Sequence, residues 1–472
     1  DDLYALGVCI GILLRHHDPL EGMSHQDIIR YKLEHGSYAA ITGKDRFTGA
    51  ILELMRGLLN DDSAQRWNFD EVESWVDGQR LSPKQNVKKI KAARPLSFNG
   101  KKYIMPSLLA YDLENNVAEV SQMVESGELE QWLERSLEIK HAGELIEKAI
   151  RSASELGKGS GYKERLANRI SVLLDPRAPL RLYGKSMFPE GIGNALTETI
   201  LGKKDVQPFA DMISDQTVLY WLDVGDTERS DASALISRFE TARAYVKLRN
   251  MGHGIERCLY ILNPECPCLS EKFKDYYVLT PEQLIMAFED MCAKGKAPVR
   301  FLDRHVAAFL SVRDRNMIDP HLVDINSERE YLRIIGEIKT LASIQQRSRM
   351  DKFPEIAKTI AKNLGPVYSR LHDRDQRRII AEKIDKVRDS GDLSKISQLI
   401  ESEDIYKRDY RNFRNAMLEY SALKKEKGKL EEQLEKQGQF GRETGRQIAA
   451  LFSAGFSAFI IFILALFIFT SS

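Results

Sequence analysis

Apolar residues recur every three or four positions along most of the chain, which is the spacing that places them on one face of an α-helix. Two short stretches differ from this pattern. Asn99-Gly100 lies between two short apolar segments, and this two-residue turn is typical of a β-hairpin. Prolines break the helical pattern again later, where we expect a second hairpin around residues 181–183. The pattern therefore predicts a mainly α fold with small β-hairpins.

The longest apolar run covers residues 448–469 near the C-terminus. At about 1.5 Å per residue a helix of this length reaches roughly 33 Å, against a hydrocarbon thickness of about 30 Å in a bilayer. Only Ser453 and Ser457 interrupt the apolar residues. Arg442 and Arg446 precede the run, and basic residues favour the cytoplasmic side. The run predicts one transmembrane helix that anchors a cytoplasmic protein by its C-terminal tail, with the C-terminus across the membrane.

A seven-residue repeat over residues 412–440 predicts a coiled-coil stalk before the membrane helix. One core position holds Phe413, Tyr420 and Leu434, the other holds Ala416, Leu423 and Leu430, and Lys427 and Gln437 are polar breaks. Two arrangements fit this repeat: a homodimer through the stalk, or a helix that packs on its own bundle. Ala450, Ala454 and Ala458 favour the homodimer, because small residues four apart let two membrane helices approach closely.

The rest of the chain divides by its composition into four regions. We expect a helical segment at residues 1–79, a basic linker at 80–95, a mostly helical domain at 96–325 and a further helical region at 326–411. The basic residues of the linker are Lys84, Lys88, Lys89, Lys91 and Arg94. No aromatic residues alternate with them, so a solvated linker is favoured over a contact with anionic lipid or nucleic acid.

Charge and cysteine content restrict the function classes. The 472 residues include 69 basic and 69 acidic ones, so the formal net charge is zero and we expect no nucleic-acid partner. The five cysteines are few and odd in number, which is typical of a reducing compartment. Both observations agree with a protein whose larger part is cytoplasmic.

Residues 2–78 carry two motifs whose order and spacing suggest a family. In the first, Asp2 opens an apolar helix that is followed by the turn Asp18-Pro19. In the second, two aspartates at 61 and 62 precede Arg66 by a few positions. These motifs resemble the C-terminal lobe of a Ser/Thr protein kinase, although Ser63 stands where the family has a proline.

Capping residues support the helices of this segment. Ser24 is expected to begin the second helix and Gly36 to end it, while Asn68 with Glu71 predicts a capping box for the last helix.

The remaining region, residues 96–325, resembles no family that we identify.

The resemblance gives Asp2 and Arg66 structural roles. In protein kinases the aspartate matching Asp2 braces the catalytic loop, and the arginine matching Arg66 pairs with a glutamate at the end of the activation segment. Both partners would precede this chain, so the resemblance implies an N-terminal truncation, and it also implies that the first helix is buried. The alternative is a small helical bundle that packs on itself and has no kinase ancestry.

The residues that phosphoryl transfer needs are missing from the sequence. A kinase requires a glycine-rich loop, a strand lysine, a catalytic aspartate followed by an asparagine, and the metal-holding Asp-Phe-Gly, which does not occur. Residues 157–161 are glycine-rich but follow a helical pattern, so they predict a helix–helix connection. Residues 184–186 lack the upstream glycine of a phosphate loop, because Pro179 takes its place. Residues 372–375 resemble a catalytic loop, yet Ile380 replaces the required asparagine.

We therefore expect no catalytic residue and no cofactor in this chain, with ATP and Mg²⁺ bound only by an intact parent kinase.

One cluster has the residue types of a zinc site. His253, Cys258, Cys266 and Cys268 would supply an imidazole and three thiolates. Paired zinc cysteines normally have two residues between them, whereas Pro267 alone separates Cys266 from Cys268. Buried thiols in a tight turn are therefore favoured over a metal site.

Together these features predict the C-terminal part of a membrane-anchored, Ser/Thr protein-kinase-like signalling protein that supplies regulatory, docking and anchoring regions. Its expected partners are the lipid bilayer, other proteins and a second copy of the chain. The alternative is a non-catalytic, tail-anchored scaffold that binds a protein partner, and a zinc-dependent enzyme is a weaker third hypothesis.

Overall fold

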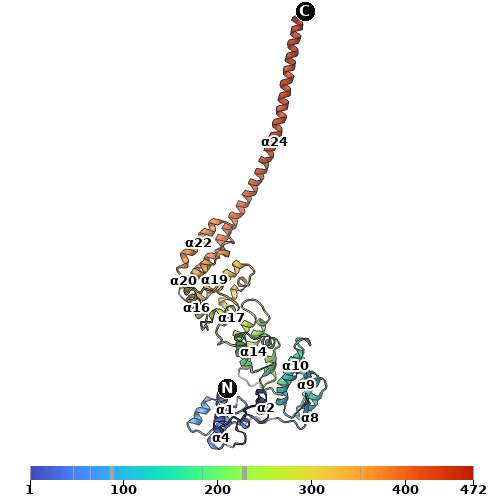
Figure 1. Ribbon diagram of the computed structural model, residues 1–472, viewed down its shortest axis with the longest axis vertical. Coiled ribbons are helices and arrows are strands. Elements are labelled where there is room, and N and C mark those ends of the chain that lie inside the picture. The colour runs from blue at the N-terminus through green and yellow to red at the C-terminus, as the bar shows by residue number, and fades with distance from the viewer. Residues whose placement is uncertain are drawn as a thin grey trace. The chain divides into compact units, whose positions relative to one another are not determined.

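The computed structural model describes residues 2–45, 47–63, 65–84, 90–182, 184–225, 231–350 and 352–470. These residues form a mainly helical chain with two short antiparallel hairpins and a long C-terminal helix, which confirms the predicted fold class (Figure 1). The chain divides into two compact units. Unit 1 contains residues 1–280 and 302–319, and unit 2 contains residues 281–301 and 320–472.

Unit 1 begins with five helices in the segment that resembles a kinase lobe. They are α1 (Asp2–Arg15), α2 (His25–His35), α3 (Ser37–Thr42), α4 (Gly49–Leu58) and α5 (Phe69–Val76). The predicted caps are confirmed: Ser24 accepts a hydrogen bond from the Asp27 N–H, the N–H of Gly36 closes α2, and Asn68 with Glu71 forms a capping box. These caps satisfy backbone groups that each helix end leaves without a partner.

Helix α1 is buried on one face only, so the prediction of a buried first helix is wrong. Gly7 and Gly11 let α1 approach α4 and α3 closely, since a Cβ atom at Gly7 would lie 2.8 Å from the Cβ of Leu58. The other face is open to solvent, and the side chain of Leu13 is 71% exposed. The physical reason is that the described residues supply packing partners to only one side of this apolar helix.

The second part of unit 1 contains the first hairpin and its surrounding helices. The elements are β1 (Leu96–Phe98), β2 (Lys101–Tyr103), α6 (Pro106–Leu113), η1 (Glu114–Asn116), α7 (Val117–Glu125), α8 (Glu128–Ser136), α9 (Ala142–Ser154) and α10 (Tyr162–Leu174). Strands β1 and β2 pair with Leu96 opposite Tyr103. Asn99 and Gly100 both have positive φ angles, 46° and 73°, as a two-residue hairpin turn requires. The first predicted hairpin is therefore confirmed.

Part of the predicted basic linker packs against this hairpin region. The N–H groups of Ala92 and Ala93 donate to the carbonyls of Ile104 and Ser136, and the Arg94 carbonyl accepts from the Trp132 indole. Residues 92–94 are thus fixed by hydrogen bonds. Lys88 and Lys89, also assigned to the linker, lie outside the described residues.

Unit 1 continues through a second hairpin and further helices. The elements are β3 (Leu180–Leu182), β4 (Lys185–Met187), η2 (Pro189–Gly191), α11 (Ile192–Leu201), α12 (Gln207–Ser214), α13 (Thr217–Val224), α14 (Ala232–Val246), α15 (Ile255–Leu262), η3 (Glu271–Phe273), α17 (Arg304–Arg313) and η4 (Arg315–Met317). The second predicted hairpin is present, with Leu180 opposite Met187, although Tyr183 lies outside the described residues.

Helix α10 is enclosed by other elements of unit 1 on several sides. It packs against α6, α7, α9, α13 and β3, and every residue from 165 to 172 is buried. Because helices surround α10 on several sides, its polar residues are buried with its apolar ones. They must therefore find hydrogen-bond partners inside the protein.

Unit 2 is a helical bundle around α19. Its elements are α16 (Pro281–Ala293), α18 (Leu322–Ile325), α19 (Glu330–Arg347), α20 (Pro354–Lys362), α21 (Gly365–Tyr368), α22 (Arg374–Arg388), α23 (Leu393–Ile400) and α24 (Glu403–Thr470), while η5 (Asp319–His321) begins at the boundary with unit 1. Helix α19 packs against α16, α18, α21 and α23. Its buried Gln345 donates to the Gly391 carbonyl at 3.0 Å and accepts from the Leu393 N–H at 2.9 Å, which fixes the turn between α22 and α23.

Helix α24 runs without interruption from Glu403 to Thr470 (Figure 1). Asp409 is its buried residue, and every residue from 410 to 443 is exposed. The C-terminal helical segment contains one stretch long and apolar enough to cross a membrane, none of it buried in the protein. In the described chain the predicted stalk therefore does not pack on its own bundle.

Gly193 offers a test of the packing between α11 and α15. A Cβ atom at Gly193 would lie 2.5 Å from the backbone oxygen of Leu262, and backbone cannot move aside as a flexible side chain can. We expect Gly193→Ala to lower the free energy of unfolding of unit 1 by about 1–3 kcal/mol, measured by urea denaturation.

Gly191→Ala is the matched control, because no atom lies within 4 Å of a Cβ at Gly191 and its φ is −81°. Its effect should stay within about 0.5 kcal/mol. Equal stability of the two variants would contradict the close helix packing.

Candidate functional site

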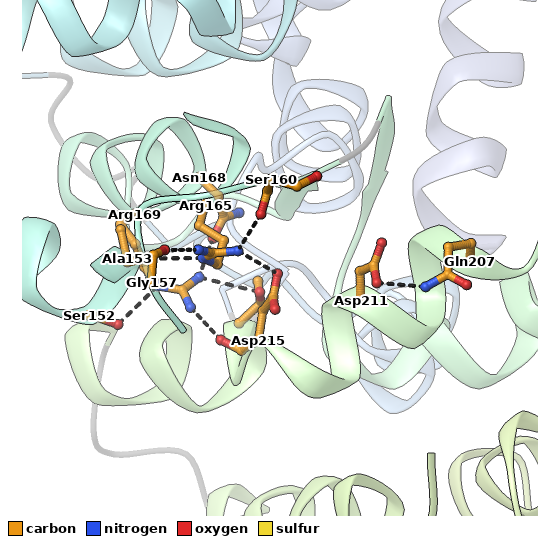
Figure 2. A network of polar contacts seen from close by, with 11 residues as sticks. Ser152, Ala153, Gly157, Ser160, Arg165, Asn168, Arg169, Gln207, Asp211 and Asp215 are labelled. Carbon is orange, nitrogen blue, oxygen red and sulfur yellow. Dashed lines mark hydrogen bonds and ion pairs between the residues drawn. The ribbon is translucent and has the colours of Figure 1, made fainter. Parts of the chain in front are cut away.

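A fully buried guanidinium lies at the centre of the polar network in unit 1. Arg169 on α10 donates from Nη2 to the Asp215 carbonyl at 2.6 Å, from Nη1 to Asn168 Oδ1 at 2.8 Å and from Nε to Ser152 Oγ at 3.1 Å (Figure 2). The ring of Tyr220 on α13 lies 4.8 Å from the guanidinium carbon. Burial lowers the pKa of Arg169 to about 10, so the side chain remains charged at neutral pH. This cation joins α9, α10 and α13.

Arg165, one turn earlier on α10, fixes the glycine-rich loop. It donates from Nε to the Ala153 carbonyl at 2.9 Å and from Nη2 to the Gly157 carbonyl at 2.6 Å (Figure 2). The loop joins α9 to α10, which confirms the predicted helix–helix connection. Its carbonyl oxygens face a cation, whereas a phosphate-binding loop directs its N–H groups at an anion. The arrangement is therefore that of a structural connection.

A cavity of about 200 Å³ opens on the other side of α10. Its polar lining comes from Glu114, Glu164, Asn168 and Ser171 together with Arg181 on β3. Arg181 is only 5% exposed, its Nη1 donates to Ser171 Oγ at 3.3 Å, and its Nε has no hydrogen-bond partner among the described residues. This cavity thus places a buried cation beside an open space.

Burial shifts the pKa values of the charged groups around this cavity. It lowers the pKa of Arg181, although the nearby carboxylates of Asp175 and Glu114 oppose that shift. It raises the pKa of Asp175 and of Glu114, and the positive charge of Arg181 opposes both shifts. Opposite charges thus interact across a poorly solvated space, which is a common property of ligand sites.

Asp2 and Arg66, for which the sequence resemblance predicts structural roles, lie at the start of α1 and just before α5. Asp2 is exposed in the first turn of α1. Arg66 is half-buried, with its guanidinium 4.8 Å from the Tyr4 ring and its Nε donating to the Asn60 carbonyl at 3.1 Å. Burial lowers the pKa of Arg66, against the attraction of Tyr4 and the nearby aspartates. Arg66 therefore packs the loop before α5 against α1.

The four residues of the predicted zinc cluster make separate contacts. Cys258 Sγ donates to the Ala242 carbonyl at 3.2 Å, and His253 Nδ1 lies 3.2 Å from a backbone carbonyl two residues earlier. Burial raises the pKa of Cys258 and of Cys268 to about 12, and it also raises that of Cys266. Among the described residues, no group of three or more His, Cys, Asp or Glu side chains is placed to hold a metal ion.

Residues 372–375, which resemble a catalytic loop in sequence, instead contact the start of α24 within unit 2. Asp373 caps α22 by accepting from the Asp375 N–H. Asp409 of α24, 3% exposed, accepts from the N–H groups of His372 and Asp373, and its Oδ2 lies 3.1 Å from His372 Nδ1. The His372 ring stacks on Phe413, with ring centroids 4.1 Å apart. These contacts fix the first turns of α24.

The contacts of Asp409 with His372 and Asp373 form what we call the Asp409 joint. We expect Asp409→Asn to weaken it. Burial alone would raise the pKa of Asp409, but hydrogen bonds from the backbone of Asp373 and His372 outweigh it, so the pKa is lowered. The joint is then intact above pH about 4, the ordinary aspartate value, and weakens as the pH falls through the lowered pKa. Loss of the charge should speed hydrogen exchange of residues 405–413 about tenfold at pH 7.

Asp404→Asn is the control, because Asp404 is exposed in the same first turn of α24. It should leave exchange unchanged and keep the acid-dependent loosening, which Asp409→Asn should lose. Identical exchange in the two variants would show that the Asp409 carboxylate does not hold the helix.

No protein-family model, curated protein or solved structure matches the chain.

Proposed function

We propose that this chain is the membrane-anchoring part of a Ser/Thr protein-kinase-like signalling protein, with regulatory and docking regions but without the ATP-binding lobe or catalytic loop. The observation that carries the proposal is the exposed apolar end of α24, which is long enough to cross a bilayer. A tether of this kind confines the attached module to the cytoplasmic membrane surface. Confinement raises its effective concentration toward membrane-bound partners.

The kinase-like part of the proposal rests on the resemblance of residues 2–78 and on the open face of α1. In a kinase lobe, the catalytic loop and activation segment pack against the helix that α1 resembles. Here the Leu6 and Leu13 side chains are 43% and 71% exposed on an otherwise apolar helix. Those surfaces are where the rest of such a lobe would pack.

A non-catalytic scaffold is the second candidate, and the contacts of Arg66 favour it. Arg66 is enclosed by Tyr4 and the Asn60 carbonyl, so the first helices satisfy this arginine from their own residues. A self-contained bundle needs no activation segment to complete it. The open face of α1 would then receive a partner protein.

Phosphotransfer by the protein made from its complete coding sequence separates the two candidates. The kinase proposal requires that the region before Asp1 encode a strand lysine, a catalytic aspartate and a metal-holding aspartate. We expect incorporation of radiolabelled phosphate from ATP and Mg²⁺ into a basic test substrate, lost when the catalytic aspartate is replaced by asparagine. If those three residues are not encoded, the kinase proposal is wrong and the scaffold remains.

Membrane extraction tests the anchor independently of catalysis. We expect the full chain to stay in the membrane pellet after alkaline carbonate washing and to require detergent for release, because burial of its apolar run in lipid is strongly favourable. Deletion of residues 448–469 should move it to the soluble fraction. Soluble full-length chain, with no change on deletion, would contradict the anchor.

We further propose that the stalk of α24 pairs with the stalk of a second copy. The seam residues Tyr420, Leu423, Leu430 and Leu434 are between 53% and 69% exposed. They recur at the seven-residue spacing of a coiled coil, and isolated helices in water rarely keep such a stripe uncovered. Because α24 is continuous, pairing of the stalks also brings the two membrane segments close together.

Sedimentation equilibrium of the full chain in density-matched detergent tests this pairing. We expect a dimer for the natural chain and a monomer for the double variant Leu423→Glu/Leu430→Glu, because the four glutamates would then repel one another inside the seam. Ser421→Glu/Ala422→Glu adds the same charge outside the seam and should remain dimeric. A monomeric natural chain would refute the pairing but leave the anchor untouched.

A further inference from the structure

The cavity beside α10 is lined by one buried cation, Arg181, and by two carboxylates, Glu114 and Glu164. Arg181 forms no close ion pair with any described residue, and the carboxylates of Asp175 and Glu114 attract it only from farther away. A buried charge normally needs a close counter-ion because loss of water is costly. Its internal contacts are a single hydrogen bond to Ser171 and the ring of Tyr111, 5.5 Å from the guanidinium carbon. The Nε–H is left without an acceptor. An anionic group entering the cavity would lie beside this cation.

The acidic side chains exclude a simple anion as the best ligand. Glu114 and Glu164 also line the cavity, so its lining carries two negative charges and one positive charge. A phosphate would gain from Arg181 and be repelled by both carboxylates. A ligand with a carboxylate for Arg181 and an ammonium group for the glutamates matches all three charges.

The volume of the cavity and the apolar part of its lining limit the size of this ligand. The cavity of about 200 Å³ is smaller than the roughly 300–1,000 Å³ of clefts that hold drug-sized molecules. Val117, Ala167 and Leu182 supply apolar surface between the charged groups. We propose that this cavity binds a small zwitterion of the α-amino-acid class, its carboxylate on Arg181, its ammonium group at Glu114 and Glu164, and a short aliphatic side chain on the apolar surface.

Three probes that differ by one charged group test the assignment by isothermal titration calorimetry of the full chain in detergent. L-valine carries both groups, 3-methylbutanoate lacks the amine and isobutylamine lacks the carboxylate. We expect saturable binding of L-valine, and binding weaker by about tenfold or more for each of the other two, because each leaves one side of the cavity unpaired. No saturable heat with L-valine would overturn the proposal, as would equal binding of 3-methylbutanoate.

Two variants assign the ligand groups to residues. Arg181→Met should abolish L-valine binding, whereas Arg177→Met, an exposed arginine of the same segment that pairs with Asp62 outside the cavity, should bind normally. Glu164→Gln should weaken L-valine binding about tenfold and leave 3-methylbutanoate no weaker, since it removes only an ammonium partner. Unchanged L-valine binding in Arg181→Met or Glu164→Gln would overturn the assignment.

Thermal unfolding distinguishes a binding residue from a structural one. Arg181 makes no close ion pair, so replacing it by an apolar side chain of similar length removes a buried charge together with the cost of its lost hydration. The ligand-free Arg181→Met chain should therefore unfold no lower than the natural chain, while L-valine should raise the unfolding temperature of the natural chain only. A large drop in the unfolding temperature without ligand would give Arg181 a structural role and overturn the site.

Discussion

The packing around α10 in unit 1 depends on burying an arginine side chain while hydrogen bonds replace the water that it loses. Arg169 is fully buried, and moving a guanidinium from water into a protein interior costs several kcal/mol unless hydrogen bonds replace the lost water. Side-chain oxygens of Ser152 and Asn168 and the carbonyl of Asp215 replace it here. Because these acceptors lie on α9, on α10 and directly after α12, the solvation of one cation also fixes the positions of these helices.

The second arginine of α10 extends the same principle to a loop. Arg165 receives its acceptors from the last turn of α9 and from the glycine-rich connection. Arg181, by contrast, is as deeply enclosed as Arg165 and has far fewer acceptors. The contrast between a satisfied and an unsatisfied guanidinium in one region is what separates a structural residue from a candidate binding residue.

Local patterns predicted the elements of this chain well, because their causes lie within a few residues. Asn99-Gly100 sets its own turn, and Asn68 with Glu71 caps its own helix. The arginines on α10 were not predicted, since at helical spacing they look like part of a solvated face. Their partners lie up to 48 residues away in sequence, as for Arg169 and Thr217, and no short-range signal marks such contacts.

The exposure of α1 and the contacts of residues 372–375 also depend on residues that are distant in the sequence. The apolar character of α1 predicted burial, but burial depends on what packs around a helix as well as on its own composition. For residues 372–375 the sequence excluded a catalytic loop, since Ile380 replaces the asparagine, but it did not indicate that they form a helix cap and hydrogen-bond to Asp409. Cavities such as the one beside Arg181 arise between elements and leave no pattern in the chain.

The joint at Asp409 sets the direction in which a 68-residue helix faces. Each residue of an α-helix turns by about 100°, so a carboxylate held at one position determines the azimuth of every side chain after it. A force on the C-terminal end of α24 would be transmitted to the bundle through the hydrogen bonds that the N–H groups of His372 and Asp373 donate to Asp409. The hydrogen bonds to Asp409 and the stacking of His372 on Phe413 therefore determine which way the exposed side chains of α24 face.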